Sequence, residues 1–433
     1  MNDSLSRRRF LAALGASSLA PGVATAQGFY SRAVPAGSAE LWQWTRAQMV
    51  LDPALTWLDT AGFGPTLRAA MVQEYRSREQ QSLDFQSFEA TQLDPARLRT
   101  KLIALAGLLG TTAEDLVFTS GTREGLSLVA QGLDLQPGDE VLTTEHEHPA
   151  AIYPWLLEAR RRGITVRQLP QTGIPRAPAA IVEQFAAALS EKTRVMAFSH
   201  VQYTDGTLMP VMELCALARP RNIFTVVDGA QAPGLIDFRV SALGCDAYAT
   251  CCHKWLNAPY GTGAVYLSPT ARARLQPMVV DGPTGWDTQD RFGTPLAAGS
   301  SVLPAAQAKF GALTRFNAPQ LAGLSVALEF HQATSRPRIS TRLLELSAYL
   351  KARLASLPGV ELLSPAHPAL ATGIVSFRAS GRDHAELVST LASEDRVIVS
   401  HVSHGASFDA IRAGAHVYNQ RAEIDKLVNS VRA

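Results

Sequence analysis

Short runs of apolar residues alternate with longer amphipathic stretches through the middle of this 433-residue chain. The runs have the length and composition of β-strands, and the stretches between them have helical spacing. Because these strands are apolar on both faces, the pattern predicts an α/β fold with a mainly parallel sheet covered by helices. The expected strands are Leu116–Thr119, Glu140–Thr144, Val195–His200, Ile223–Asp228, Ala247–Cys251 and Gly263–Leu267, and the expected helices are Gly125–Gly132, Ala150–Arg161, Ala179–Leu189 and Val211–Ala218.

The pattern changes in the last third of the chain, after a segment rich in Gly, Pro and Asp (281–304) that reads as a loop. We therefore expect a large domain over 61–308, a smaller C-terminal α/β domain over 309–433, and an N-terminal segment over 27–60. The C-terminal elements expected from the pattern are a long helix over about Leu321–Leu354, strands at Val360–Leu363, Ile374–Arg378 and Val397–Ser400, and a final helix from about Ala422.

Residues 1–26 have the three parts of an export signal. Ser6-Arg7-Arg8-Arg9-Phe10-Leu11 matches the twin-arginine signature, and a short apolar stretch continues through Ala20. Ala24-Thr25-Ala26 then offers small residues for cleavage. The apolar stretch is too short to span a bilayer. The sequence therefore predicts a cleaved 1–26 signal peptide, passage through the twin-arginine (Tat) machinery, a periplasmic location and no stable membrane association.

Charge and cysteine content narrow the possible partners. The 40 basic and 38 acidic residues are well mixed and leave a net charge of +2, so nothing points to nucleic acid or an anionic membrane. We expect a small-molecule or peptide amino substrate. The four cysteines fit no metal spacing and lie in apolar contexts, so we expect buried free thiols and no metal; pairing in an oxidising periplasm is the alternative. They are Cys215, Cys245, Cys251 and Cys252.

The segment from Asp228 to Lys254 carries the strongest chemical signal. Asp228 ends an apolar run, where a charge needs a partner, although a turn aspartate is the plain alternative. Gln231 follows, and Lys254, one of few lysines in the chain, closes the next apolar segment after His253. A carboxylate for a pyridinium nitrogen, an amide for a phenolic oxygen and a lysine for an imine are what pyridoxal phosphate (PLP) requires. The sequence therefore predicts PLP as cofactor.

Two further motifs follow predicted strands. Ser120-Gly121-Thr122-Arg123 opens a helix, so its N–H groups and hydroxyls can hold a phosphate, although such a motif is equally often a simple cap. His148 follows Glu147 and can stack on a cofactor ring and relay protons, with His146 as the second choice. We also expect Arg412 to bind a substrate carboxylate, while noting that most arginines in this chain lie on the surface.

Together these residues resemble the class V aminotransferases, a family of fold-type I PLP-dependent enzymes that includes cysteine desulfurases and isopenicillin N epimerase-like proteins. The resemblance runs from Leu58 to the C-terminus and is strongest over Val227–Leu267, where D-G-A-Q precedes H-K-W-L-x-A-P-x-G-T-G. It implies a homodimer with sites at the subunit interface. It also implies these roles: Lys254 as the imine lysine, Asp228 at the pyridine nitrogen, Gln231 at the phenolic oxygen, His148 over the ring, Gly121, Thr122, the backbone near Arg123, and His253 at the phosphate, and Arg412 at the substrate carboxylate.

The chain departs from this family at several positions. The segment Val397–Ile411 lacks the cysteine that desulfurases carry before the substrate arginine, which disfavours persulfide chemistry. Cys251 stands where many relatives have a phosphate-binding serine, and Arg123 where a threonine is common. Tyr203 replaces an asparagine near the phenolic oxygen. The run Asn317-Ala318-Pro319 lacks the Gly-Thr that relatives offer across the dimer.

These observations predict an enzyme that joins PLP to an amino-acid-like group and labilises its Cα–H bond, in the manner of an aminotransferase. With its export signal, the chain resembles secreted members of this family that tailor the siderophore pyoverdine in the periplasm. A peptide natural product is therefore a candidate substrate. An epimerase or C–S lyase acting on a small amino acid derivative is the first alternative. A non-catalytic PLP-fold binding protein is the second, because the predicted phosphate site is altered.

Overall fold

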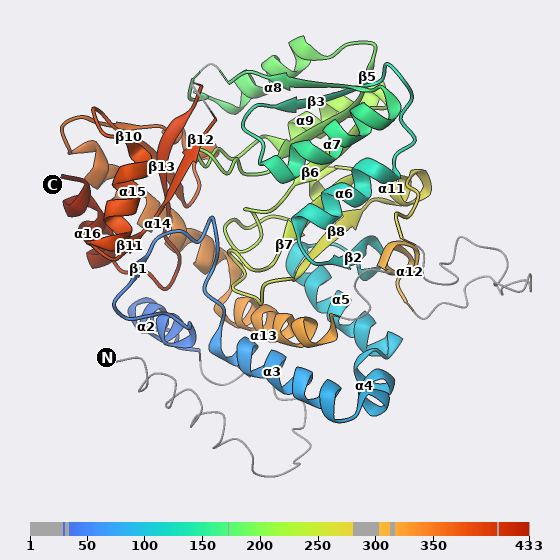
Figure 1. Ribbon diagram of the computed structural model, residues 1–433, viewed down its shortest axis with the longest axis horizontal. Coiled ribbons are helices and arrows are strands. Elements are labelled where there is room, and N and C mark those ends of the chain that lie inside the picture. Colours follow the sequence, from blue (N-terminus) through green and yellow to red (C-terminus); the bar gives the residue numbers. More distant parts are fainter. Residues whose placement is uncertain are drawn as a thin grey trace, which may run out of the picture.

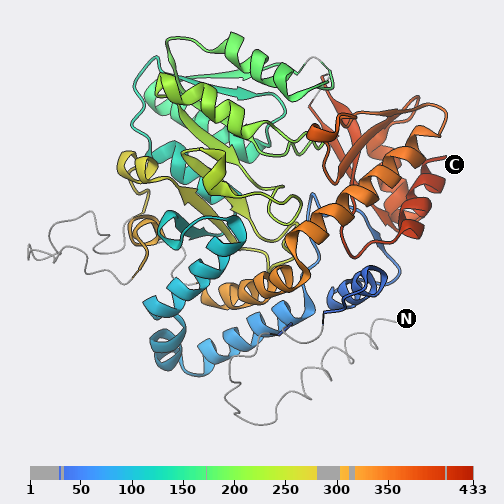
Figure 2. The same cartoon turned by 180° about the vertical axis from the view of Figure 1, so that it is seen from behind.

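A seven-stranded sheet and a four-stranded sheet, each with its helices, form the two main parts of the computed structural model (Figures 1 and 2). The structure describes residues 29–30, 34–171, 173–279, 303–311, 317–404 and 407–432. The predicted signal peptide and nearly all of the loop predicted at 281–304 lie outside these residues. Within the described chain, no helix has both the length and the apolar character needed to cross a membrane.

The large sheet is mainly parallel, which confirms the predicted fold class. Its strand order is β2 (Leu116–Thr119), β8 (Gly263–Leu267), β7 (Ala247–Cys251), β6 (Phe224–Asp228), β5 (Thr193–Ser199), β3 (Glu140–Thr144) and β4 (Thr165–Leu169). β8 pairs antiparallel with both of its neighbours, β2 and β7, and the other strand pairs of this sheet are parallel. The sequence pattern missed β4 because this strand is largely polar and partly exposed.

Helices cover both faces of this sheet, and the period-two alternation of the strands assigns residues to each face. Met196 and Phe198 of β5 contact the core on one face, whereas Val195 and Ala197 contact the core on the other. The first core includes α5 (Pro95–Leu109), α8 (Pro178–Ala188) and α9 (Val211–Ala218), and the second includes α6 (Thr122–Gly132) and α7 (Pro149–Arg162).

The C-terminal part is an antiparallel sheet in the order β12 (Ser400–Ser403), β13 (Asp409–Gly414), β10 (Ile374–Ala379) and β9 (Val360–Leu362). It shares a core with α14 (Arg336–Ala355), α15 (His384–Ser393) and α16 (Arg421–Arg432). The strand expected at Val397–Ser400 is wrong in detail, because the chain forms β11 (Val397–Ile398) and then β12, each with a different partner. The shorter elements are α2 (Ser38–Gln48), α4 (Phe85–Gln92), α10 (Val240–Leu243), α11 (Pro269–Arg274) and α12 (Ala305–Phe310).

The long helix expected over Leu321–Leu354 is also wrong, because two helices meet at Ser335. α13 (Ala318–Thr334) ends there and α14 begins one residue later, and Ser335 has φ 75°. α13 packs beside α3 (Arg68–Leu83) against the core of the large sheet, as Figures 1 and 2 show, whereas α14 packs against the C-terminal sheet. The break therefore lets the chain pass from one part of the molecule to the other.

The N-terminal segment also joins the two parts. Its short strand β1 (Thr56–Trp57) pairs in parallel with β11, and the N–H of Leu58 donates to the carbonyl of Ile398 at 2.9 Å. The chain then turns at 61–65, where the N–H of Gly64 donates to the carbonyl of His253 at 3.0 Å. A Cβ at Gly64 would lie 1.8 Å from the carbonyl oxygen of Lys254, so glycine permits this close approach. The segment thus lies against the predicted site.

Candidate active site

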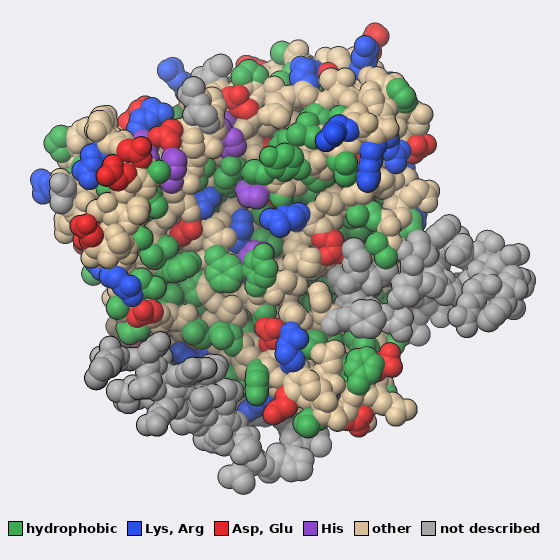
Figure 3. All heavy atoms as spheres, viewed as in Figure 1, with side chains coloured by type: hydrophobic (Ala, Val, Ile, Leu, Met, Phe, Trp, Pro, Cys, Tyr) green, Lys and Arg blue, Asp and Glu red, His purple; other side chains and the backbone are tan. Residues whose placement is uncertain are grey.

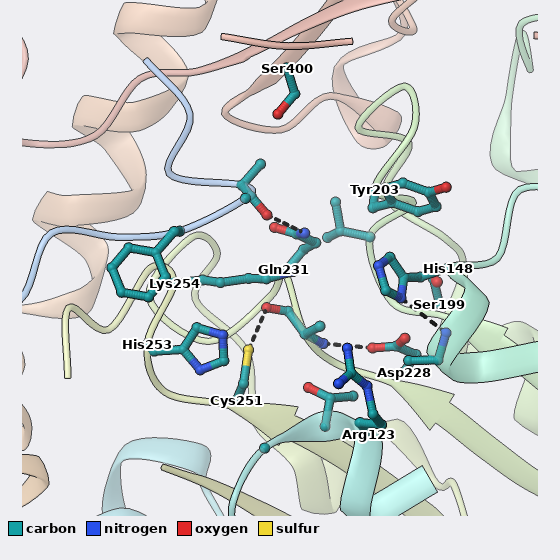
Figure 4. Close-up of a pocket in the computed structure, with 18 of the residues that line it drawn as sticks. Arg123, His148, Ser199, Tyr203, Asp228, Gln231, Cys251, His253, Lys254 and Ser400 are labelled. Atoms are coloured by element: carbon teal, nitrogen blue, oxygen red, sulfur yellow. Dashed lines mark hydrogen bonds between the residues drawn. The ribbon is translucent and has the colours of Figure 1, made fainter. Parts of the chain in front are cut away.

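A pocket of about 730 Å³ opens at the carboxyl ends of the parallel strands, where α/β sheets commonly bind ligands. Figure 4 shows its labelled side chains converging from several elements, and Figure 3 shows basic and histidine side chains near the centre of this face. The structure brings all of the site residues predicted from the sequence to this pocket: Gly121, Thr122, Arg123, His148, Asp228, Gln231, His253, Lys254 and Arg412.

Asp228 and Lys254 are the two central charged groups of the pocket. Asp228 ends β6, is 6% exposed and accepts a hydrogen bond from the N–H of Ala230 at 2.8 Å. Burial raises the pKa of Asp228, against the effects of this hydrogen bond and of Lys254. Burial also lowers the pKa of Lys254, to which Arg412 adds, while Cys251 and Asp228 oppose it. A buried carboxylate favours a cationic partner, and a lysine with a lowered pKa has more of the neutral amine that attacks carbonyls.

His148 is held in one orientation at the start of α7. Its Nδ1 accepts a hydrogen bond from the N–H of Ala150 at 3.1 Å, and its ring meets Tyr203 edge to face at 5.1 Å between centroids. Burial lowers the pKa of His148 to about 4, with Lys254 adding to the shift. The ring is therefore neutral at neutral pH and carries its proton on Nε2. The competing candidate His146 does not line this pocket; it is buried against Thr204 instead.

Gln231 is fixed by two protein partners. Its Nε2 donates to the carbonyl of Ala61 at 2.9 Å, and its Oε1 accepts from the indole N–H of Trp255 at 2.7 Å. One amide N–H therefore remains for a ligand oxygen. The contact with Ala61 also anchors the N-terminal turn to the pocket floor.

Two polar groups that line the pocket have no protein partner. The hydroxyl of Thr122, in the first turn of α6, and Nδ1 of His253 are both buried without a hydrogen-bond partner. The exposed Arg123 adds a positive charge beside them. Unpaired buried donors at a helix N-terminus are suited to a phosphate group. The backbone is close here too, because a Cβ at Gly263 would lie 2.5 Å from the Cα of Gly121.

These features fit PLP. A phosphate would satisfy Thr122 and His253, a pyridinium nitrogen would pair with the buried Asp228, and Lys254 lies within the same pocket for covalent attachment. Cys251 also lines the pocket, and burial raises the pKa of its thiol. A neutral thiol is a weak donor, so Cys251 contributes less to a phosphate site than serine would.

Arg412 is the one predicted residue whose contacts differ from its predicted role. Its Nη2 donates to Oδ1 of Asp59 at 2.9 Å and to the hydroxyl of Ser400 at 3.2 Å, and Nη1 donates to the carbonyl of Tyr203 at 3.0 Å. The side chain is 5% exposed. The arginine lines the pocket, but in this structure it is already paired.

Sequence reasoning missed several residues of the site. Asp59 gave a usable signal, because it follows a short apolar run and precedes a glycine turn, as Asp228 does. Glu147 gave a weaker sequence signal. Its side chain is buried and accepts hydrogen bonds from the hydroxyl (2.5 Å) and the N–H (3.1 Å) of Ser199, which is paired with Asp228 in the sheet. Burial raises the pKa of Glu147 to about 7. The rings of Phe63 and Tyr260 flank His253 at 5.8 and 4.6 Å.

All four cysteines are buried free thiols, as expected. The described residues contain no group of three or more His, Cys, Asp or Glu side chains suited to a metal ion.

Comparisons with known proteins agree with this geometry. Residues 73–427 match the family model described as aminotransferase class V. The isopenicillin N epimerase of Amycolatopsis lactamdurans is 33% identical over 405 residues, which cover 91% of this chain and 98% of that protein. A cysteine desulfurase of Dickeya dadantii is 31% identical over 73% of this chain and 76% of its own length.

Solved structures show the same likeness. The cystine C–S lyase C-DES, in complex with its reaction product cysteine persulfide, superposes with a TM-score of 0.75 at 27% identity, covering 87% of this chain and 97% of that one. A mutant of C-DES with glycine covalently linked to its PLP cofactor gives a TM-score of 0.77 at 26% identity, over 89% and 98% of the two chains.

Proposed function

The chain belongs to the class V aminotransferase family of PLP-dependent enzymes, and we propose that it labilises the Cα–H bond of an amino-acid-like group, as an aminotransferase does. The observation that carries this proposal is the pocket that Asp228 and Lys254 line together with Thr122 and His253, whose buried polar atoms have no protein partner. When bound, PLP supplies the electron sink that weakens bonds to the α-carbon.

The residues of the chain divide the remaining work. Thr122 and His253 bind the phosphate, with Arg123 adding charge, and Asp228 keeps the ring nitrogen protonated. The neutral amine of Lys254 would accept the α-proton of the substrate at Nζ and would then act as the acid that returns a proton to the substrate. His148 would face the ring of the bound cofactor, and its single Nε2–H fixes the direction in which it donates.

The substrate and the cellular setting are part of the proposal. Residues 1–26 support export by the twin-arginine route to the periplasm, and this route carries folded proteins. A periplasmic member of this family is suited to tailoring a peptide siderophore such as pyoverdine. The family resemblance also supports a homodimer.

Epimerisation is the second candidate reaction, and the identity to isopenicillin N epimerase over 91% of the chain favours it. A C–S lyase on a small amino acid derivative is supported by the likeness to C-DES. Persulfide chemistry of the desulfurase type is disfavoured, because Val397–Ile411 contains no cysteine.

The test begins with the visible absorbance of the purified protein after addition of PLP. We expect a band from the lysine-bound cofactor that disappears in Lys254→Ala, while Lys192→Ala, a change to an exposed lysine, keeps it. Absence of the band from the wild-type protein would support the non-catalytic alternative and reject an enzyme.

Incubation with amino acids then separates the reactions. Conversion of the cofactor to its amine form indicates transamination, whereas uptake of solvent deuterium at Cα without that conversion indicates epimerisation.

A further inference from the structure

Arg412, Asp59 and Ser400 form a closed hydrogen-bonded group at the edge of the pocket. Nη2 of Arg412 donates to Oδ1 of Asp59 at 2.9 Å and to the hydroxyl of Ser400 at 3.2 Å, and that hydroxyl donates to Oδ2 of Asp59 at 2.7 Å. The side chains of Arg412 and Asp59 are 5% and 15% exposed. The arginine charge is therefore balanced by a carboxylate of the same chain, in a place with little water to screen the pair.

The geometry also limits what Arg412 can offer to a ligand. A guanidinium binds a carboxylate best through two parallel N–H groups on one edge. Both edges that have two such groups include Nη2, which Asp59 and Ser400 already engage. Nη1 is bonded to the carbonyl of Tyr203, and Nε is buried without a partner. No complete edge of Arg412 is left for a substrate carboxylate.

We propose that Asp59 is a specificity-determining residue that engages and neutralises Arg412, and so lowers the preference of the pocket for a free carboxylate beside the reacting amine. The substrate class that fits is a primary amine whose neighbouring carboxyl group is uncharged, as in an amide or peptide linkage. This inference rests on the proposed function, because it concerns the amine that reacts at Lys254. It differs from the role predicted from the sequence, in which Arg412 binds a substrate carboxylate.

The experiment compares L-alanine with L-alaninamide, two amines that differ in the charge of one group. Each is titrated into the PLP-bound protein, and the dissociation constant is read from the change in cofactor absorbance. Asp59→Asn keeps an oxygen for Arg412 but removes the negative charge. We expect the preference for L-alanine over L-alaninamide to rise about tenfold in this variant, because the positive charge of Arg412 is no longer balanced by a carboxylate of the same chain. For each protein we take the ratio of the two dissociation constants and compare this ratio between the variant and the wild type. The different basicities of the two amines affect both ratios equally and therefore cancel.

Asp52→Asn is the matched control, because Asp52 lies in the same N-terminal segment but forms an exposed ion pair with Arg396 at 3.2 Å. The control should keep the wild-type ratio, and an Asp59→Asn ratio within about twofold of wild type would overturn the inference. Calorimetry with propionate, a carboxylate without an amine, tests the same point independently of the reaction. Tighter binding to Asp59→Asn supports the inference and equal binding rejects it, even if neither amine alters the absorbance and the proposed function itself fails.

Discussion

The side chain of His148 has two separate roles: it caps a helix, and it faces the pocket. Its Nδ1 accepts the N–H of Ala150 at the start of α7, and its ring lines the site. His148→Asn keeps an acceptor for the cap but removes the ring, whereas His148→Ala removes both. We expect both variants to lose about 10²-fold or more in turnover, and only His148→Ala to lose about 1 kcal/mol of unfolding free energy.

Turnover and urea denaturation of the two variants measure these effects. Equal stability of the two variants would contradict the capping role, and normal turnover of His148→Asn would remove the ring from the chemistry.

The junction of α13 and α14 shows how a single backbone conformation decides the arrangement of elements. Ser335 has φ 75° and ψ 121°, a region that is strained for residues with a Cβ. Ser335→Gly should raise the free energy of unfolding by about 1 kcal/mol, because relief of strain exceeds the added entropy of the unfolded chain. Ser356→Gly, at the other end of α14 with φ −82°, should instead lower it by about 0.5–1 kcal/mol. Denaturation midpoints with unchanged m-values check both changes, and a loss of stability in Ser335→Gly would show that the strain is absent.

For the molecule as a whole, buried histidines determine the response to acid. Burial lowers the pKa to about 3 for His200 and His416 and to about 4 for His146, His148, His253 and His331. Between these values and pH 6.5 the unfolded chain binds protons that the folded chain does not, so stability is present above pH 6.5 and is lost as the pH falls. Glu147 acts in the opposite direction, because its pKa of about 7 means that the folded state holds the extra proton.

We therefore expect the unfolding free energy to fall by about 3–6 kcal/mol between pH 6 and pH 5, since each unbalanced proton contributes about 1.4 kcal/mol per pH unit. His416→Gln keeps a donor for the carbonyl of Trp255, which His416 contacts at 3.0 Å, and should lose about 1.4 kcal/mol less over the same interval. Urea denaturation at both pH values measures how the unfolding free energy of the wild type and of the variant changes with pH. Identical slopes would mean that His416 is not protonated differently in the two states.

The sequence predicted the parts of the molecule whose signals are local. Asp228 and Lys254 are separated by one strand and its connections, so a motif reports their proximity. Asp59 and Arg412 are 353 residues apart in the chain, so no local motif could predict their pairing. The break at Ser335 had a sequence signal, because Pro337 stands in the first turn of α14, but the hydrophobic pattern alone did not reveal it. Polar β4 carried no apolar alternation to detect.

The N-terminal strand has a consequence for the order in which the chain can fold during its synthesis. β1 has no partner until residues 397–398 have left the ribosome, and Asp59 must wait for Ser400 and Arg412. Closing so long a loop is slow, because chain entropy is lost before the distant contacts form. The large sheet can assemble earlier, but the part of the pocket formed by Ser400 and Arg412 cannot form until these residues have been synthesised.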